Sequence, residues 1–183
     1  MSLKLLIEKC RKNDTNAQSD LYKLFSRKLF PLCLKYSRNY AEAEDNLQDA
    51  FLTIFSKISQ FDNKGAFEGW LKRIVINTAL QRYRGKSVLN IVNEATIEDV
   101  EIEVEDEDIS IDFLLTSIQE LPDRYRMVFN LYALDGYSHK EIAAMLEITT
   151  GTTKSNLARA RMILKDKVEQ YKASLSSQQY NGQ

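Results

Sequence analysis

The sequence has little of what interrupts helices or builds compact cofactor sites: six Gly, two Pro and one His among 183 residues. Because Gly and Pro punctuate turns, their scarcity predicts long helices, few turns and little strand. A single histidine disfavours a His-based metal site or acid–base relay. The two cysteines, Cys10 and Cys33, lack metal-ligand spacing, and we expect a reduced pair of buried thiols.

Long apolar runs are also missing. No stretch approaches the ~18 apolar residues needed to cross a bilayer, so we expect a cytoplasmic protein without a membrane span. There is no glycine-rich phosphate loop, and no paired catalytic carboxylates lie beside a base. Asp45 and Asp49 are spaced like helical metal ligands, but further ligands are lacking. We therefore predict no catalytic residues, no cofactor and no metal.

The formal charge of −1 hides a segregation of charge along the chain. Residues 1–86 carry 16 Lys and Arg against nine Asp and Glu, whereas residues 87–110 carry nine acidic residues and no basic one. Such asymmetry is typical of nucleic-acid contacts beside an acidic arm. We predict an acidic flexible linker over residues 87–110, which is either a solvated spacer or an arm that occupies a channel built for nucleic acid.

The first module, residues 1–86, is predicted to be helical. Ser19 or Asp20 is expected to cap an early helix, which Pro31 then breaks or kinks. In the following helix, residues 42–61, the apolar residues share one face. The opposite side carries Asp45, Asp49 and Leu52, with Gln48 at its flank. An exposed leucine ringed by carboxylates is either an ordinary surface residue or a docking face for a basic partner helix.

The third helix, "AFEGWLKRIVINTALQRYRGK", has a core face and a mixed flank. Phe67, Leu71, Ile74 and Thr78 are predicted to be buried. The flank combines one aromatic ring with cations and an amide: Trp70, Arg73, Asn77 and Arg84. Cations hold phosphates, amides hydrogen-bond base edges and rings stack on unpaired bases, so the flank is a candidate nucleic-acid stripe. The alternative is a partly buried tryptophan beside solvated arginines.

The second module, residues 111–172, has helix-turn-helix spacing. Pro122 suits the first turn of a helix that Gly136 ends. Ser138 with Glu141 forms a capping box at the start of the next helix, and a three-residue turn leads to the basic stretch "TTGTTKSNLARARMILK". We therefore predict an all-α protein with two small helical domains, the second a helix-turn-helix domain. Residues 173–183 are predicted to be a disordered tail.

The basic stretch concentrates positive charge on one helix. Thr153, Leu157, Ala160, Leu164 and Val168 are predicted to form its buried face. The outward residues near its N-terminus are mostly small, which lets the backbone N–H groups approach phosphates closely. Arg159, Arg161 and Lys165 add the charge that drives non-specific DNA affinity. A solvated basic helix is the alternative.

Three segments in this order resemble the extracytoplasmic-function (ECF) group of bacterial RNA polymerase sigma factors: "AEAEDNLQDAFLTIF", "FEGWLKRIVINTALQRYR" and "LPDRYRMVFNLYALDGYSHKEIAAMLEITTGTTKSNLARAR". The resemblance covers roughly residues 5–170. It implies a sigma factor that binds core RNA polymerase through the beta and beta-prime subunits, directs it to promoter DNA and promotes strand opening. A stand-alone helix-turn-helix transcriptional regulator is the alternative that we weigh against it.

The resemblance also implies three sets of site residues. The polymerase-binding set is Asp45, Gln48, Asp49 and Leu52. The set that recognises and melts the minus-ten element is Phe61, Asn63, Lys64, Phe67, Trp70, Arg73, Asn77 and Arg84. The set for the minus-thirty-five element is Thr150, Gly151, Thr152, Lys154, Ser155, Asn156, Arg159 and Arg161.

Further partners follow from the resemblance. An anti-sigma factor is expected, which either covers the exposed residues Ile76, Leu80 and Tyr83 or wedges between the two modules. The family usually has Gly where Glu147 stands, which predicts roughly 1 kcal/mol of strain if that position needs a positive φ. It often has Arg where Asn156 stands, so one DNA contact is missing. The thin set of base-reading residues leaves room for an auxiliary DNA-targeting partner.

Overall fold

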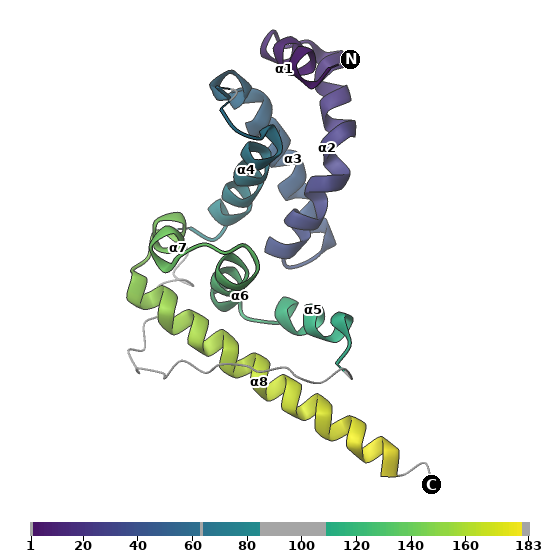
Figure 1. The fold of residues 1–183 in the computed structure, drawn as a ribbon, viewed down its shortest axis with the longest axis vertical. Helices are drawn as coiled ribbons and strands as arrows, with labels where there is room; N and C mark the ends of the chain where they lie inside the picture. Colours follow the sequence, from purple (N-terminus) through teal and green to yellow (C-terminus); the bar gives the residue numbers. More distant parts are fainter. Residues whose placement is uncertain (1, 63, 85–108, 181–183) are drawn as a thin grey trace. The chain divides into compact units, whose positions relative to one another are not determined.

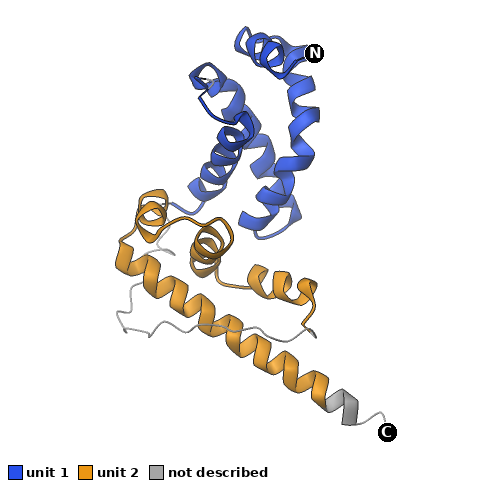
Figure 2. Cartoon of the chain, in the orientation of Figure 1, with its two compact units in different colours: residues 1–84 blue, residues 85–183 orange. Residues whose placement is uncertain are grey.

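The computed structural model describes residues 2–62, 64–84 and 109–180, which form helices and turns and no strand (Figure 1). The chain divides into two compact units, residues 1–84 and 85–183 (Figure 2). The all-α prediction is confirmed. The predicted linker, residues 87–110, lies outside the described residues except for its last two.

Unit 1 contains α1 (Leu3–Arg11), α2 (Thr15–Tyr36), α3 (Tyr40–Lys57), the short η1 (Ile58–Gln60) and α4 (Phe67–Gln81). The start of α2 differs from the prediction, because the side chain of Asp14, not Ser19 or Asp20, accepts a hydrogen bond from the first turn. The helix also continues through Pro31 to Tyr36. Buried Leu29 and Cys33 flank the proline, so packing holds both halves in one helix.

The core of unit 1 lies between α2, α3 and α4. The apolar face of α3 and the face of α4 that includes Phe67 and Leu71 are buried in it, as the periodicity predicted. Cys10 and Cys33 are both free and fully buried, which confirms the expectation of reduced, buried thiols. Burial raises the pKa of the Cys33 thiol to about 12. Burial, with Asp14 and Asp20 nearby, also raises the pKa of Cys10.

Unit 2 contains α5 (Ile111–Gln119), α6 (Asp123–Phe129), the π-helical turn η3 (Asn130–Leu134), α7 (His139–Leu146) and α8 (Thr150–Tyr180). The helix-turn-helix is α7 and α8. Both hydrogen bonds of the predicted capping box between Ser138 and Glu141 are present. Glu147 ends α7 with a φ of 60°, so this position has the left-handed backbone that favours glycine.

The last helix is longer than predicted. It was expected to end near residue 172, but α8 continues to Tyr180. Between Lys165 and Tyr180 there is no Gly or Pro to stop it. The ring of Tyr171 also stacks on Phe113 of α5, with 4.0 Å between ring centroids. This contact stabilises the helix beyond the helix-turn-helix itself.

Candidate docking face and nucleic-acid interface

The docking stripe, which we define as Asp45, Gln48, Asp49 and Leu52, lies on the solvent side of α3. All four side chains are exposed, and Leu52, at 69%, is the most exposed of the large hydrophobic residues that the structure describes in unit 1. The prediction that these residues share an outward face is confirmed. A leucine surrounded by carboxylates and an amide suits a partner with apolar and basic groups.

A cation from another helix contacts this stripe. Arg82 follows the last residue of α4, and its Nη2 donates to Asp49 Oδ2 at 2.9 Å. Its Nη1 lies 3.9 Å from Asp45 Oδ2. Sequence reasoning missed Arg82 because it lies on the end of a different helix, 33 residues from Asp49.

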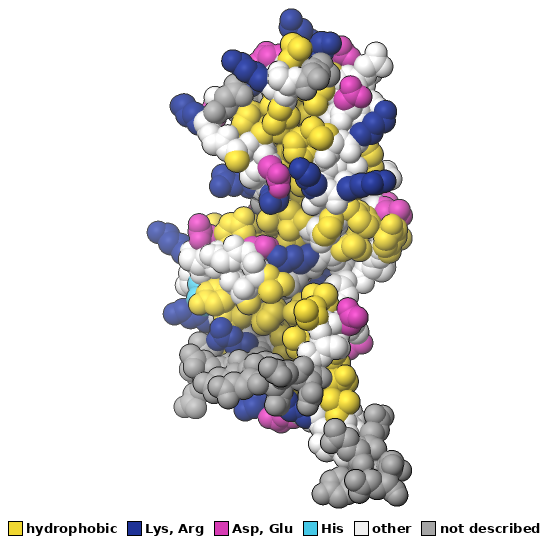
Figure 3. Space-filling model, turned by 45° about the vertical axis from the view of Figure 1, so that its right-hand side comes forward, with side chains coloured by type: hydrophobic (Ala, Val, Ile, Leu, Met, Phe, Trp, Pro, Cys, Tyr) yellow, Lys and Arg dark blue, Asp and Glu magenta, His cyan; other side chains and the backbone are white. Residues whose placement is uncertain are grey.

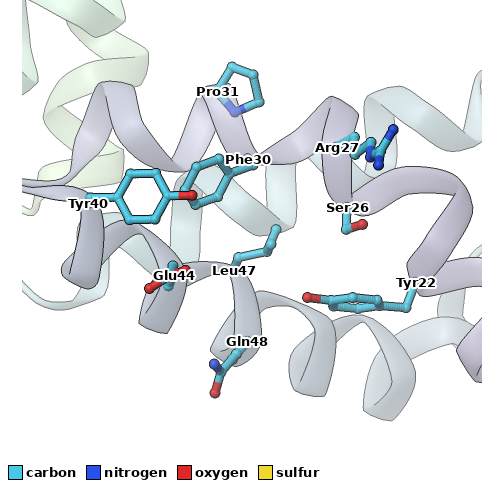
Figure 4. A pocket seen from close by; sticks show the side chains of 9 residues that line it. All are labelled: Tyr22, Ser26, Arg27, Phe30, Pro31, Tyr40, Glu44, Leu47 and Gln48. Carbon is cyan, nitrogen blue, oxygen red and sulfur yellow. The ribbon is translucent and has the colours of Figure 1, made fainter.

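An open hollow of about 340 Å³ lies beside the stripe, between α2 and α3 (Figure 4). Its aromatic lining includes Tyr22, Phe30 and Tyr40, and the Phe30 and Tyr40 rings meet edge to face at 5.0 Å. Gln48 of the docking stripe also lines it. The hollow therefore adjoins the stripe at Gln48.

The aromatic residues of the predicted minus-ten set form one cluster. Phe61, Phe67 and Trp70 lie with ring centroids 5.0 to 5.6 Å apart, and the Phe67 and Trp70 planes are 20° apart. Phe61 and Phe67 are buried in the hydrophobic core, and their place around a base stays a prediction. Trp70 is half-buried and has the only ring of the three that reaches solvent.

The polar members of the same set lie mostly at the surface. Arg73 and Lys64 are exposed, Asn77 and Arg84 are half-buried, and Asn63 lies outside the described residues. The nearby Ile76, Leu80 and Tyr83, expected to be exposed, are instead buried, with at most 4% of each accessible.

A contact from α1 fixes the start of the loop between η1 and α4. Arg11 donates to the carbonyl oxygens of Ile58 and Phe61, and its Nη1 bonds Glu8 at 2.6 Å. No local sequence pattern indicates this contact, which joins residues 50 apart. The loop that follows Phe61, including the exposed Lys64, is thus anchored at one end by α1.

In unit 2, the N-terminal part of α8 divides the predicted DNA-binding set. Thr150, Gly151 and Lys154 are exposed, and Ser155, Arg159 and Arg161 are half-buried. Thr152 and Asn156 are buried, with 9% and 4% of each accessible, and their role as DNA contacts stays a prediction. Both residues adjoin the predicted buried face of Thr153, Leu157 and Ala160, and α8 packs against both α6 and α7.

The single histidine, His139, packs within the helix-turn-helix domain. Its ring stacks on Tyr132 at 4.6 Å, and His139 Nδ1 lies 3.0 Å from the hydroxyl of Thr153. The guanidinium of Arg161 lies over the same tyrosine ring, 5.9 Å from its centroid. These contacts join α7 to α8 and set the orientation of the basic helix.

Lys and Arg side chains lie on the surfaces of both units, with Asp and Glu among them (Figure 3). Within the described ranges, no cluster of three or more His, Cys, Asp or Glu has the geometry of a metal site. None of the helices described combines the length and the apolar character that crossing a bilayer requires.

Comparison with protein families separates the two units in the same way. Residues 21–88 match the family described as Sigma-70 region 2, and residues 114–164 match Sigma-70, region 4. The match therefore covers the docking stripe and the α4 flank in one family, and the helix-turn-helix in the other.

Full-length relatives decide the family. The ECF RNA polymerase sigma factor SigW of Bacillus subtilis (strain 168) is 31% identical over 90% of this chain and 96% of its own length. The chain belongs to the ECF RNA polymerase sigma factors. The ECF RNA polymerase sigma-E factor of Escherichia coli (strain K12) is 28% identical over 90% of this sigma factor and 93% of its own length.

The fold agrees with this assignment. The sigma factor RpoE from Bartonella quintana, solved in complex with the anti-sigma factor NepR, superposes with a TM-score of 0.51. It is 24% identical and covers 82% of this chain and 96% of its own. As a sigma factor, the protein directs RNA polymerase to promoters in transcription initiation. The stand-alone regulator is set aside, because region 2 accounts for the first unit.

Proposed function

We propose that the sigma factor binds core RNA polymerase through the docking stripe of α3, and opens promoter DNA with the flank of α4. The observation that carries the proposal is the outward placement of Asp45, Gln48, Asp49 and Leu52 in the unit that matches region 2. Exposed Leu52 supplies the apolar contact, and the carboxylates supply charge for basic groups on the beta-prime or beta subunit. The protein itself catalyses no bond change.

In the minus-ten interface, Trp70 is the group for stacking on an unpaired base, and Asn77 is the group for hydrogen bonding to a base edge. Buried Phe61 and Phe67 support the tryptophan from the core side. Arg73 and Lys64 are exposed and available to phosphates. A base can stack on Trp70 only after it has left the duplex. Binding of such bases therefore favours the open state of the promoter.

In the minus-thirty-five interface, the start of α8 approaches the DNA groove. Gly151 and Thr150 are exposed and small, which permits close backbone approach. Lys154 and Arg159 supply cations for phosphates, and Ser155 is the accessible hydroxyl for a base edge. With Thr152 and Asn156 buried, this set is mainly phosphate-binding. We therefore retain an auxiliary DNA-targeting partner in the proposal.

The domain boundaries of the proposal are residues 1–86 for polymerase and minus-ten binding, and residues 111–172 for minus-thirty-five binding. We place the protein in the cytoplasm, where bacterial RNA polymerase works. An anti-sigma partner also belongs to the proposal, supported by the solved complex of a fold relative.

The test is run-off transcription with purified core polymerase and a promoter that this sigma factor serves. Leu52→Ala is expected to weaken core affinity about tenfold, because truncating an exposed anchor in an interface costs 1–2 kcal/mol. The matched control is Leu5→Ala on α1, a leucine that is half exposed and outside the stripe. Asp49→Ala and Asn77→Ala are expected to reduce transcription at core binding and at strand opening, respectively. Unchanged transcription in all three stripe and flank variants would overturn the residue assignment.

A further inference from the structure

We propose that Arg82 is a positioning residue for polymerase binding, which holds the carboxylates of Asp45 and Asp49 in the arrangement that the polymerase engages. The proposal rests on the proposed function of the docking stripe. It adds a residue of α4 to a surface that otherwise belongs to α3. It also links the helix that binds the polymerase to the helix that carries the minus-ten flank.

The geometry shows one guanidinium bridging two like charges. Asp45 and Asp49 are one helical turn apart, where two carboxylates repel each other. Arg82 pairs with Asp49 at 2.9 Å and approaches Asp45 to 3.9 Å, using a different terminal nitrogen for each. The planar fork of an arginine can serve two acceptors in fixed directions, which an ammonium group does less well. Arg82 therefore offsets the repulsion and restricts the rotamers of both carboxylates.

The exposed fractions of the three side chains indicate that Arg82 supports polymerase binding and does not compete with it. The Arg82 side chain is 31% exposed, whereas those of Asp45 and Asp49 are 66% and 53% exposed. The cation thus lies deeper, and the carboxylates lie on the solvent side. Both recorded contacts with Arg82 use Oδ2, which leaves Oδ1 of each carboxylate to accept a bond from a partner. A basic group of the polymerase can then join the cluster without displacing Arg82.

The same residue lines an open hollow of about 430 Å³ between α3 and α4. Asp49, Leu52 and Thr53 line it from α3, and Thr78, Gln81 and Arg82 line it from the end of α4. Leu52 therefore borders a depression whose other wall is α4. A polymerase segment with a cation beside an apolar side chain fits this surface, because the apolar group meets Leu52 while the cation meets the carboxylates.

The consequence for binding is one of preorganisation. Carboxylates already held in place lose less conformational freedom when the partner arrives. The effect of Arg82 must then pass through Asp49, its closer partner. An arginine that touched the polymerase or the DNA directly would act whether or not Asp49 were charged.

The experiment is a double-mutant cycle on affinity for purified core RNA polymerase, with full-length wild type, Arg82→Gln, Asp49→Asn and the double variant. Arg82→Gln is expected to weaken binding by about threefold to fivefold, the scale of a partly exposed ion pair. In the Asp49→Asn background the same change is expected to have little effect. Arg82→Lys is expected to restore part of the loss. The control is Lys72→Gln, which breaks an ion pair of α4 with Glu68 and is expected to leave affinity unchanged.

Two results would overturn the proposal. Tighter binding by Arg82→Gln would make Arg82 a competitor, and an equal loss in both backgrounds would make it an independent contact. Failure of the underlying function is distinguishable, because Asp49→Asn and Leu52→Ala would then leave core affinity unchanged. Urea unfolding followed by the fluorescence of Trp70, the single tryptophan, checks that each variant is folded. If Arg82→Gln is unfolded, the cycle is run with Arg82→Lys.

Discussion

The two surfaces proposed to bind DNA are built differently. The flank of α4 presents one half-buried ring, Trp70, backed by the buried rings of Phe61 and Phe67. The start of α8 presents small exposed residues followed by cations such as Lys154. Region 2 thus offers an aromatic platform on a rigid core, and region 4 offers backbone and charge.

This difference matches two physical tasks. An unpaired base exposes its face, which an aromatic platform can stack on. A duplex exposes phosphates and groove edges, for which close backbone approach and cations suffice. In the proposed function, melting depends on α4 and duplex affinity on α8, and the changes below test that division.

Replacing the platform ring is expected to have the largest effect. Trp70→Ala should lower open-complex formation by about tenfold to a hundredfold, since stacking one base contributes about 1–3 kcal/mol. Trp70→Phe should keep much of the activity. Permanganate footprinting of the opened region, with saturating core polymerase, measures the effect. An equal loss of affinity for closed minus-thirty-five duplex would break the comparison.

Removing cations from α8 is expected to weaken the binding of the holoenzyme to the promoter, the step that precedes strand opening. Lys154→Ala and Arg159→Ala should each weaken holoenzyme binding to the promoter by up to about tenfold, and each should reduce the slope of log affinity against log salt by about one. Lys167→Ala is the matched control on the same helix, because Lys167 pairs with Glu120 and lies outside the proposed set. Fluorescence anisotropy over a range of salt concentrations gives both quantities. A salt slope unchanged by either variant would remove α8 cations from the interface.

The sequence predicted the helices and the solvent face of α3 well, because a strong 3.6-residue period specifies both. The capping box at Ser138 was equally predictable, because all its contacts are local. The burial of residues at the edge of a helix face was less predictable. Asn156 is buried because α8 packs against both α6 and α7. A single-helix period cannot show how many neighbours a helix has.

Long-range polar contacts also could not be predicted from the sequence. Arg82 and Arg11 each bridge elements that are far apart along the chain, and nothing in their local context distinguishes them from other surface arginines. The continuation of α2 through Pro31 has a similar cause, since tertiary packing overrides a local helix breaker. The candidate site was thus predictable in its outward residues and not in the residues that support them.

Removing the Arg11 side chain, which anchors the loop between η1 and α4, tests whether strand opening depends on a rigid region 2. Arg11→Ala should lower open-complex formation by about threefold to tenfold, because two partly buried hydrogen bonds to carbonyl oxygens, worth ~1 kcal/mol or less each, are lost. Glu8→Ala is the control, since it removes only the other partner of Arg11. The same permanganate assay applies. Identical behaviour of the two variants would show that the carbonyl contacts do not matter.

Relieving backbone strain in the turn of region 4 is expected to stabilise unit 2. Glu147 has a φ of 60°, so Glu147→Gly should be about 1 kcal/mol more stable than Glu147→Ala, which keeps the left-handed cost. Comparing these two variants cancels the loss of the glutamate side chain. Circular dichroism measures the melting, and Trp70 fluorescence identifies the transition of unit 1. Opening by the α4 platform should be unchanged, which keeps the two surfaces separable.

The smallest expected effect is on the pH dependence of stability. It concerns unit 1 alone, because both cysteines lie in that unit. The Cys33 pKa is raised from 9.0 to about 12 in the folded state, so folding favours the protonated thiol. The resulting stability is present below pH 9 and is lost as pH rises toward 12; at pH 9 the loss is about half a kcal/mol relative to pH 7. Urea unfolding monitored by Trp70 should show this loss, and Cys33→Ala should show less of it despite lower stability at both pH values. An unchanged pH dependence in the variant would mean that the thiol does not titrate on unfolding as proposed.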